Sequence, residues 1–138
     1  MLPQYHILFA LIASLILYLF NLPMSFILLF FLAAVLIDID HYFYYVAKKK
    51  NLNLFQAYKY HKYELIKELQ KTKQKYVLVI FHTAEFFILL LILSLIFSRI
   101  WPIFLGCLFH EMADLVYDLT RKEKKYKRAF SLIYYLTQ

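Results

Sequence analysis

Residues 77–95 read VLVIFHTAEFFILLLILSL, an apolar run that contains one imidazole and one carboxylate, His82 and Glu85. The run is long enough to cross the roughly 30 Å hydrocarbon core of a bilayer as a helix that rises about 1.5 Å per residue. A charged side chain at the centre of such a helix costs roughly 2.5–3.5 kcal/mol even on insertion scales. The sequence therefore predicts that groups elsewhere in the chain compensate His82 and Glu85.

The chain as a whole has the composition of a membrane protein. Of its 138 residues 63% are hydrophobic, which is more apolar surface than a soluble domain of this size can bury. We expect an all-α membrane protein, a bundle of four transmembrane helices that forms a single membrane domain over residues 1–138. The apolar runs that predict these helices cover about 4–20, 24–47, 76–98 and 101–118.

The basic residues lie in alternate connections between the apolar runs. Nine lie between residues 48 and 75 and six between 121 and 128, whereas Arg99 stands alone in an opposite connection. By the positive-inside rule, both termini and the 48–75 segment are expected in the cytoplasm, with the chain in the plasma (inner) membrane. Because of this distribution, we interpret the net charge of +7 as a sign of contact with anionic membrane lipids. We expect no binding of nucleic acid.

Two segments outside the apolar runs are basic and contain aromatic residues. A helix over about 52–73 would place its apolar side chains on one face and most of its lysines elsewhere, as in helices that lie on a membrane surface. The residues on the apolar face are Leu54, Tyr58, His61, Leu65 and Leu69. The C-terminal tail, 119–138, combines a basic stretch with an apolar one and is expected to contact anionic lipid in the same way.

Three of the apolar runs carry a histidine and a carboxylate three or four residues apart. Residues at this spacing share one face of a helix. The pairs are Asp38 with His41, His82 with Glu85, and His110 with Asp114. With the orientation given above and a rise of about 1.5 Å per residue, all three pairs fall in the inner half of the bilayer.

Imidazole and carboxylate groups together favour Zn, Mn or Fe as a bound ion. We expect one or two divalent ions, zinc foremost, and the predicted ligands are Asp38, His41, His82, Glu85, His110 and Asp114. Glu85 and Asp40 are also predicted as catalytic residues, with Glu85 as a ligand or as the general base. The roles of His61, Glu111 and Asp118 stay open. His6 has no acidic neighbour in the sequence and is not expected to be a ligand.

Three motifs resemble the membrane-bound metal-dependent hydrolase family, the YdjM-like group. They are IDIDH at 37–41, FHTAEFF at 81–87 and GCLFHEMADLVYD at 106–118. Asp38, Asp40 and His41 match the D-x-D-H element of that family, and Gly106, His110 and Asp114 match its G-x-x-x-H-x-x-x-D element. The middle element departs from the H-R-G-x-T-H-S stretch of many members, because only His82 and Thr83 correspond to it. The resemblance implies a small multi-helix membrane hydrolase that depends on a metal.

The expected function is hydrolysis of an ester or phosphoester near the cytoplasmic face, with a lipid as the candidate substrate. Two other functions stay open. A di-iron or di-manganese oxidoreductase would build its site from Glu-x-x-His pairs of a helix bundle, and His82 with Glu85 has that spacing in reverse order. A non-enzymatic metal-binding or transport protein would use buried acids as an ion pathway.

Overall fold

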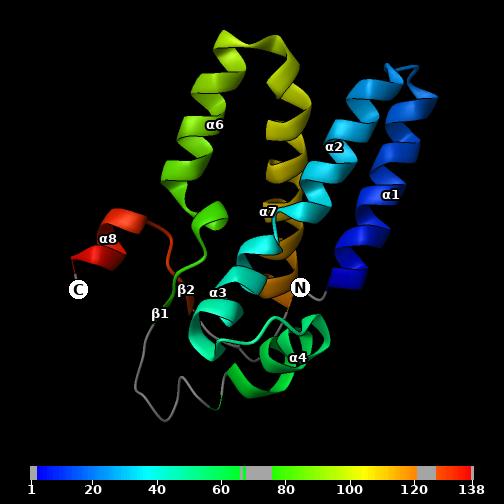
Figure 1. Ribbon diagram of the computed structural model, residues 1–138. Helices are drawn as coiled ribbons and strands as arrows, with labels where there is room; N and C mark the ends of the chain where they lie inside the picture. Colours follow the sequence, from blue (N-terminus) through cyan, green and yellow to red (C-terminus); the bar gives the residue numbers. More distant parts are fainter. Residues whose placement is uncertain (1–2, 66, 68–75, 121–126, 138) are drawn as a thin grey trace. The chain divides into compact units, whose positions relative to one another are not determined.

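The computed structural model is helical apart from two short strands (Figure 1), and it describes residues 3–65, 67, 76–120 and 127–137. The chain divides into two compact units. The first unit consists of Met1–Ile37 and Phe86–Lys122, and the second of Asp38–Glu85 and Glu123–Gln138.

The first unit is built from apolar helices. They are α1 (Pro3–Leu19), α2 (Met24–Leu36), α6 (Ala84–Ile96), which enters this unit at Phe86, and α7 (Trp101–Thr120). A tight turn joins α1 to α2, with Asn21 in the left-handed region at φ 58°. A 3-10 turn, η3 (Ser98–Ile100), leads into α7. α2 packs against both α1 and α7.

Gly106 lets the backbones of α2 and α7 come close together. A Cβ atom at this position would lie 2.3 Å from the carbonyl oxygen of Phe30 and 3.1 Å from the backbone nitrogen of Ala34. It would also lie 3.0 Å from the Cβ of Ala33, itself a small residue. Small residues at a helix interface allow this approach, which is a common device in membrane bundles. The contact between α2 and α7 therefore requires glycine at position 106.

Two helical stretches in the described part of the chain, Met24–Lys49 and Ser98–Thr120, are long and apolar enough to cross a membrane. Two further apolar helices are shorter, namely α1 with 17 residues and α6 with 13. Length and composition thus support two spans in the described residues, where the sequence predicted four.

The third apolar run was predicted to be helical from residue 76, but its first residues are not helical. It begins with the two-residue strand β1 (Tyr76–Val77) and continues through a 3-10 turn, η2 (Ile80–His82), before α6 starts at Ala84. Thr83 is extended, with φ −93° and ψ 151°, and its hydroxyl donates to the Ile80 carbonyl at 2.8 Å. His82 and Glu85 consequently lie in different elements and do not share a helix face.

The second unit is formed by short elements around a small core. They are α3 (Ile39–Lys49), α4 (Leu54–Lys59), the π-helical turn η1 (Tyr60–Glu64), β1, β2 (Lys127–Arg128) and α8 (Leu132–Leu136). β1 and β2 pair in parallel. The buried core residues are Tyr45, Ala57, Tyr60, Leu65, Val77 and Val79.

The helix predicted over 52–73 is present in part, as α4 and η1 over 54–64, and its residues 66 and 68–73 lie outside the described part. Its inner face matches the prediction at Leu65, which is buried, but differs at its start, because Ala57 and Tyr60 are buried whereas Leu54 is 70% exposed. The π-helical turn changes the helical period, which shifts the buried face relative to a regular α-helix. In the predicted tail, α7 continues to Thr120, and the described residues 127–137 form β2 and α8.

Replacing Gly106 by alanine should destabilise the first unit. The added Cβ would collide with the main-chain oxygen of Phe30, which cannot move like a flexible side chain. Overpacking of this kind costs about 1–3 kcal/mol, so the thermal unfolding temperature in detergent should fall. The matched control is Met112→Ala, on the same helix at a side chain that is 59% exposed. Equal unfolding temperatures for the two variants would contradict the close contact of α2 and α7.

Candidate metal centre

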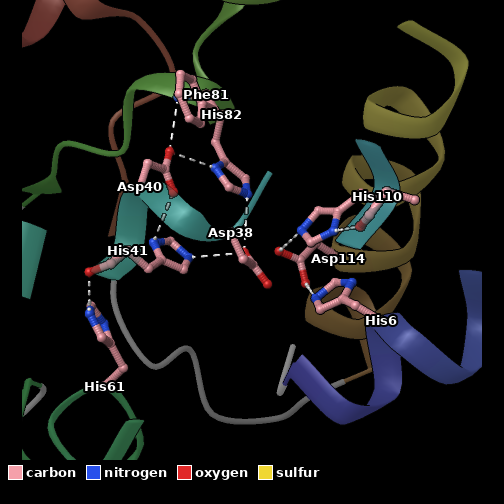
Figure 2. A network of polar contacts seen from close by, with 10 residues as sticks. His6, Asp38, Asp40, His41, His61, Phe81, His82, His110 and Asp114 are labelled. Carbon is pink, nitrogen blue, oxygen red and sulfur yellow. Dashed lines mark hydrogen bonds and ion pairs between the residues drawn. The ribbon is translucent and has the colours of Figure 1, made fainter. Parts of the chain in front are cut away.

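Three buried residues of the first unit, which we call the first-unit cluster, bring their polar atoms together (Figure 2). His6 comes from α1, and His110 and Asp114 come from α7; their exposed fractions are 3%, 1% and 2%. His6 Nε2 lies 3.1 Å from Asp114 Oδ1, and His110 Nε2 lies 3.9 Å from Asp114 Oδ2. The two imidazole rings stack with their centroids 3.7 Å apart. One ligand atom from each residue lies within 4.8 Å of the others.

A main-chain carbonyl of α2 fixes the orientation of His110. Its Nδ1 lies 2.8 Å from the Ala34 oxygen, so that Nδ1 carries the proton and donates, and Nε2 keeps its lone pair on the side of Asp114. Ala34 belongs to the last turn of α2, whose carbonyls have no partner within the helix. Histidines that bind metals almost always donate the other ring N–H in this way. The close approach at Gly106 brings the Ala34 carbonyl within reach.

The sequence prediction for His6 was wrong about its surroundings. His6 was not expected to be a ligand because the sequence places no acid near it, yet its imidazole lies beside the Asp114 carboxylate. This contact depends on how α1 and α7 pack, and residue spacing cannot reveal it. The available signal was the histidine itself, since an ionisable side chain in an apolar helix needs a partner.

A second group of polar residues, which we call the second-unit cluster, contains Asp38, Asp40, His41 and His82. Asp38 immediately precedes α3, Asp40 and His41 lie in its first turn, and His82 lies in η2. The Asp38 Oδ1 atom is 3.5 Å from His41 Nε2 and 3.6 Å from His82 Nε2. The two imidazole rings lie nearly parallel, with an interplanar angle of 8°.

Asp40 orients His82. Its Oδ2 accepts a hydrogen bond from the Phe81 N–H at 2.9 Å and lies 3.2 Å from His82 Nδ1. Asp40 Oδ2 already accepts from the Phe81 N–H, so it serves as acceptor for His82 Nδ1–H as well, and His82 Nε2 is left on the side of Asp38. This is the carboxylate–histidine arrangement that supports metal-binding imidazoles. The contacts give Asp40, which was predicted to be catalytic, the role of a residue that positions His82.

The other oxygen of Asp40 strengthens the case for a bound cation. Asp40 Oδ1 and His41 Nδ1 are 3.6 Å apart, and both are buried without a hydrogen-bond partner in the described part of the chain. A buried polar atom without a partner costs roughly 1–3 kcal/mol. Positive charge beside these carboxylates would offset part of that cost.

His61 supports His41 from the surface helix. Its Nε2 lies 2.8 Å from the His41 carbonyl oxygen, and the two rings stack with centroids 5.3 Å apart. Burial lowers the pKa of the His61 imidazole, although the hydrogen bond to the His41 carbonyl opposes this shift. A neutral His61 therefore donates Nε2–H to that carbonyl. Its role, left open by the sequence, is to hold the start of α3.

Glu85 does not occupy the position that the sequence predicted. Its carboxylate accepts hydrogen bonds from the Ser131 hydroxyl at 2.5 Å and from the Leu132 and Ile133 N–H groups at 3.0 and 3.2 Å. Both oxygens of the Glu85 carboxylate therefore accept hydrogen bonds from the start of α8. The prediction of Glu85 as a metal ligand or general base relied on a helix face shared with His82, and that shared face is absent. Of the two remaining acids on α7, Asp118 is exposed and Glu111 is half-buried.

The spacing of the donor atoms fits a divalent ion. Ligand atoms at about 2.0–2.1 Å around a tetrahedral zinc lie roughly 3.3–3.4 Å from one another. The nitrogen–oxygen separations are 3.1 and 3.9 Å in the first-unit cluster and 3.5 and 3.6 Å around Asp38 Oδ1. Small side-chain movements would bring either set to ligand distance. The buried histidine and aspartate groups could thus hold a metal ion.

Comparison of the chain with models of known protein families, with curated proteins and with solved structures finds no match.

Replacing His6 by alanine should weaken metal binding, because the first-unit cluster loses one of its three ligand groups. We expect the dissociation constant for Co²⁺ to rise more than about 100-fold, the upper end of what loss of an outer-shell partner costs. The measurement is a titration followed by the visible absorption of Co²⁺, in an Asp38→Asn background that removes the shared carboxylate of the second-unit cluster. Tyr5→Ala is the control, since this neighbouring side chain is 43% exposed. Equal affinities for the two variants would exclude His6 as a ligand.

Proposed function

We propose that the protein is a membrane-embedded metal-dependent hydrolase that acts on an ester or phosphoester near the cytoplasmic face, with a phospholipid as candidate substrate. One observation carries the proposal: in each unit a buried histidine has its Nδ1 held by an acceptor and its Nε2 directed at an aspartate. One or two divalent ions, zinc foremost, fit these donors. The resemblance of the three sequence motifs to the YdjM-like hydrolase family supports the same conclusion.

Each cluster has ligands of its own. His6, His110 and Asp114 would hold an ion in the first unit, and Asp38, His41 and His82 in the second. A divalent ion at such a site polarises an ester or phosphoryl oxygen and lowers the pKa of water to roughly 7. A carboxylate beside such an ion, as Asp38 is in the second-unit cluster, could take the proton of the attacking water.

We propose that all four apolar segments cross the membrane. With 17 residues, α1 lies at the lower limit of the roughly 17–25 that a transmembrane helix needs. With 13 residues, α6 is shorter than this range, so its flanking turns η2 and η3 would have to complete the crossing. The surfaces of the two shorter helices suit lipid, since Leu15 and Leu19 of α1 are 59% and 70% exposed and Leu95 of α6 is 69% exposed. The positive-inside rule then places both termini in the cytoplasm of the plasma membrane.

The surface of α4 and η1 favours a lipid substrate over a soluble one. Leu54 at the start of α4 is 70% exposed, and Leu52, two residues before the helix, is 74% exposed. Beside them, Lys59 lies 4.5 Å above the Phe55 ring and Lys62 lies 4.9 Å above the Tyr63 ring. Exposed leucines next to lysines and aromatic rings are typical of surfaces that enter the headgroup region of anionic membranes. This surface would draw a phosphate-bearing headgroup toward the second unit.

The position of Glu85 bears on the alternative functions. The di-metal oxidoreductase hypothesis used the pair of His82 and Glu85, and the hydrogen bonds of Glu85 to Ser131 and Leu132 remove that pair. The transport hypothesis requires a pathway of acids, whereas Asp38 and Asp114 are each grouped with histidines in a compact cluster. Hydrolysis is therefore the function that the geometry supports best.

Metal analysis and hydrolysis should be measured on the same sample. We expect protein purified without chelator to hold zinc and to release the headgroup of phosphatidylglycerol in nanodiscs. A zinc chelator should abolish this release and added zinc should restore it, because the ion supplies the activation of water. Asp114→Asn should be inactive, and Tyr5→Ala should keep full activity. Bound zinc without hydrolysis of any ester or phosphoester would contradict the hydrolase, and bound iron would favour the oxidoreductase.

A further inference from the structure

The C-terminal segment runs alongside the stretch that carries His82. β2 pairs in parallel with β1, so that Lys127 lies opposite Tyr76 and Arg128 opposite Val77. The Ala129 N–H donates to the Val77 carbonyl at 3.0 Å, and the Ala84 N–H donates to the Phe130 carbonyl at 2.9 Å. The two segments are thus joined at both ends of the 77–84 stretch.

Glu85 and Ser131 close this association. The Glu85 carboxylate accepts from the Ser131 hydroxyl and from two main-chain N–H groups at the start of α8, those of Leu132 and Ile133. The Ser131 Oγ in turn accepts from the Tyr134 N–H at 3.2 Å and caps α8. Hydrogen bonds to an ionised acceptor are about twice as strong as neutral ones, so three of them form a firm connection.

The conformation between these connections determines where His82 points. The apolar composition of 77–95 favours a continuous helix, yet η2 ends at His82 and α6 begins only at Ala84. The first N–H groups of a helix have no acceptor within it, and the Ala84 N–H is one of these groups in α6. The Phe130 carbonyl is its acceptor. If α6 extended backward instead, the Phe81 N–H would turn into the helix and lose Asp40, its present acceptor.

We propose that residues 127–136 form a clasp that holds 76–85 in this non-helical conformation and thereby positions His82 against Asp38 and Asp40. Glu85 is then a positioning residue that closes the clasp through Ser131. The conformational part of this proposal stands independently of any activity. Its consequence for metal binding rests on the proposed function, because it treats His82 as a ligand.

The test compares substitutions at Ser131. Ser131→Ala removes the hydroxyl that donates to Glu85 and caps α8, whereas Ser131→Thr keeps a hydroxyl at the same place. Thr137→Ala is the matched control, since it removes a hydroxyl of the same segment that donates within the tail, to the Tyr134 carbonyl at 3.0 Å. The first readout is amide hydrogen exchange at Phe81 and Ala84, with the amides of α7 as internal reference.

In Ser131→Ala we expect exchange at Phe81 and Ala84 to quicken by about tenfold or more, because local opening of the clasp frees both N–H groups. Ser131→Thr should restore protection, Thr137→Ala should leave it unchanged, and the α7 amides should not respond. In an Asp114→Asn background, Ser131→Ala should also weaken Co²⁺ binding about 10- to 100-fold, as for other losses of supporting contacts around a metal. Ser131→Thr should restore that affinity as well.

A second pair of variants guards against general loss of folding. Ser131→Asp places two carboxylates together and should open the clasp, and adding Glu85→Gln should close it, because the amide donates to the new carboxylate. Unchanged protection of Phe81 and Ala84 in both Ser131→Ala and Ser131→Asp would overturn the proposal. If the wild-type protein takes up no cobalt, the proposed function fails, and the exchange measurement still decides on the clasp.

Discussion

The cost of burying ionisable groups in an apolar chain governs the structure of both units. Five of the seven polar residues that are buried in the described part are histidines or aspartates: His6, Asp40, His82, His110 and Asp114. Isolated in low dielectric, such groups would cost several kcal/mol each, a large fraction of the roughly 5–15 kcal/mol that stabilises a domain. Each is instead placed against a partner of opposite character, either His with Asp or His with a main-chain carbonyl.

The two units provide hydrogen-bond partners for these buried groups through different local structures. In the first, the absence of a side chain at Gly106 allows α2 to lie close to α7, and the unsatisfied end of α2 supplies the acceptor for His110. In the second, a break in helical structure leaves main-chain N–H groups available, and the Asp40 carboxylate takes the one at Phe81 together with the His82 imidazole. Both solutions leave an imidazole nitrogen facing an aspartate. A divalent cation suits that pattern, because it satisfies the lone pair and the negative charge together.

The sequence was informative where contacts follow from helical spacing. Asp38 with His41 and His110 with Asp114 lie three and four residues apart, and the structure has both contacts, at 3.5 and 3.9 Å. Predominantly helical structure and long apolar helices also follow from composition. The contact of His6 with Asp114 joins α1 to α7, and that of Asp40 with His82 joins residues 42 apart, so no local pattern predicts either.

Glu85 shows the limit of a periodic pattern most clearly. The spacing of His82 and Glu85 indicates a shared helix face only if the helix includes both residues. The start of α6 at Ala84 separates them, and donors from Ser131 to Ile133 engage the carboxylate. Those donors lie more than forty residues later in the chain. Apolar composition indicates where a helix can form, whereas main-chain hydrogen bonds from distant segments determine where it begins.

The most direct test of the central claim is X-ray absorption spectroscopy at the zinc edge on protein purified without chelator. The account predicts a zinc ion bound by nitrogen and oxygen atoms alone at about 2.0–2.2 Å, with the scattering signature of imidazole rings. Binding by sulfur at about 2.3 Å would place the ion at the thiolate of Cys107, the single cysteine of the sequence and outside both clusters, and would contradict the account. Protein that holds no metal and takes up none would contradict it as well.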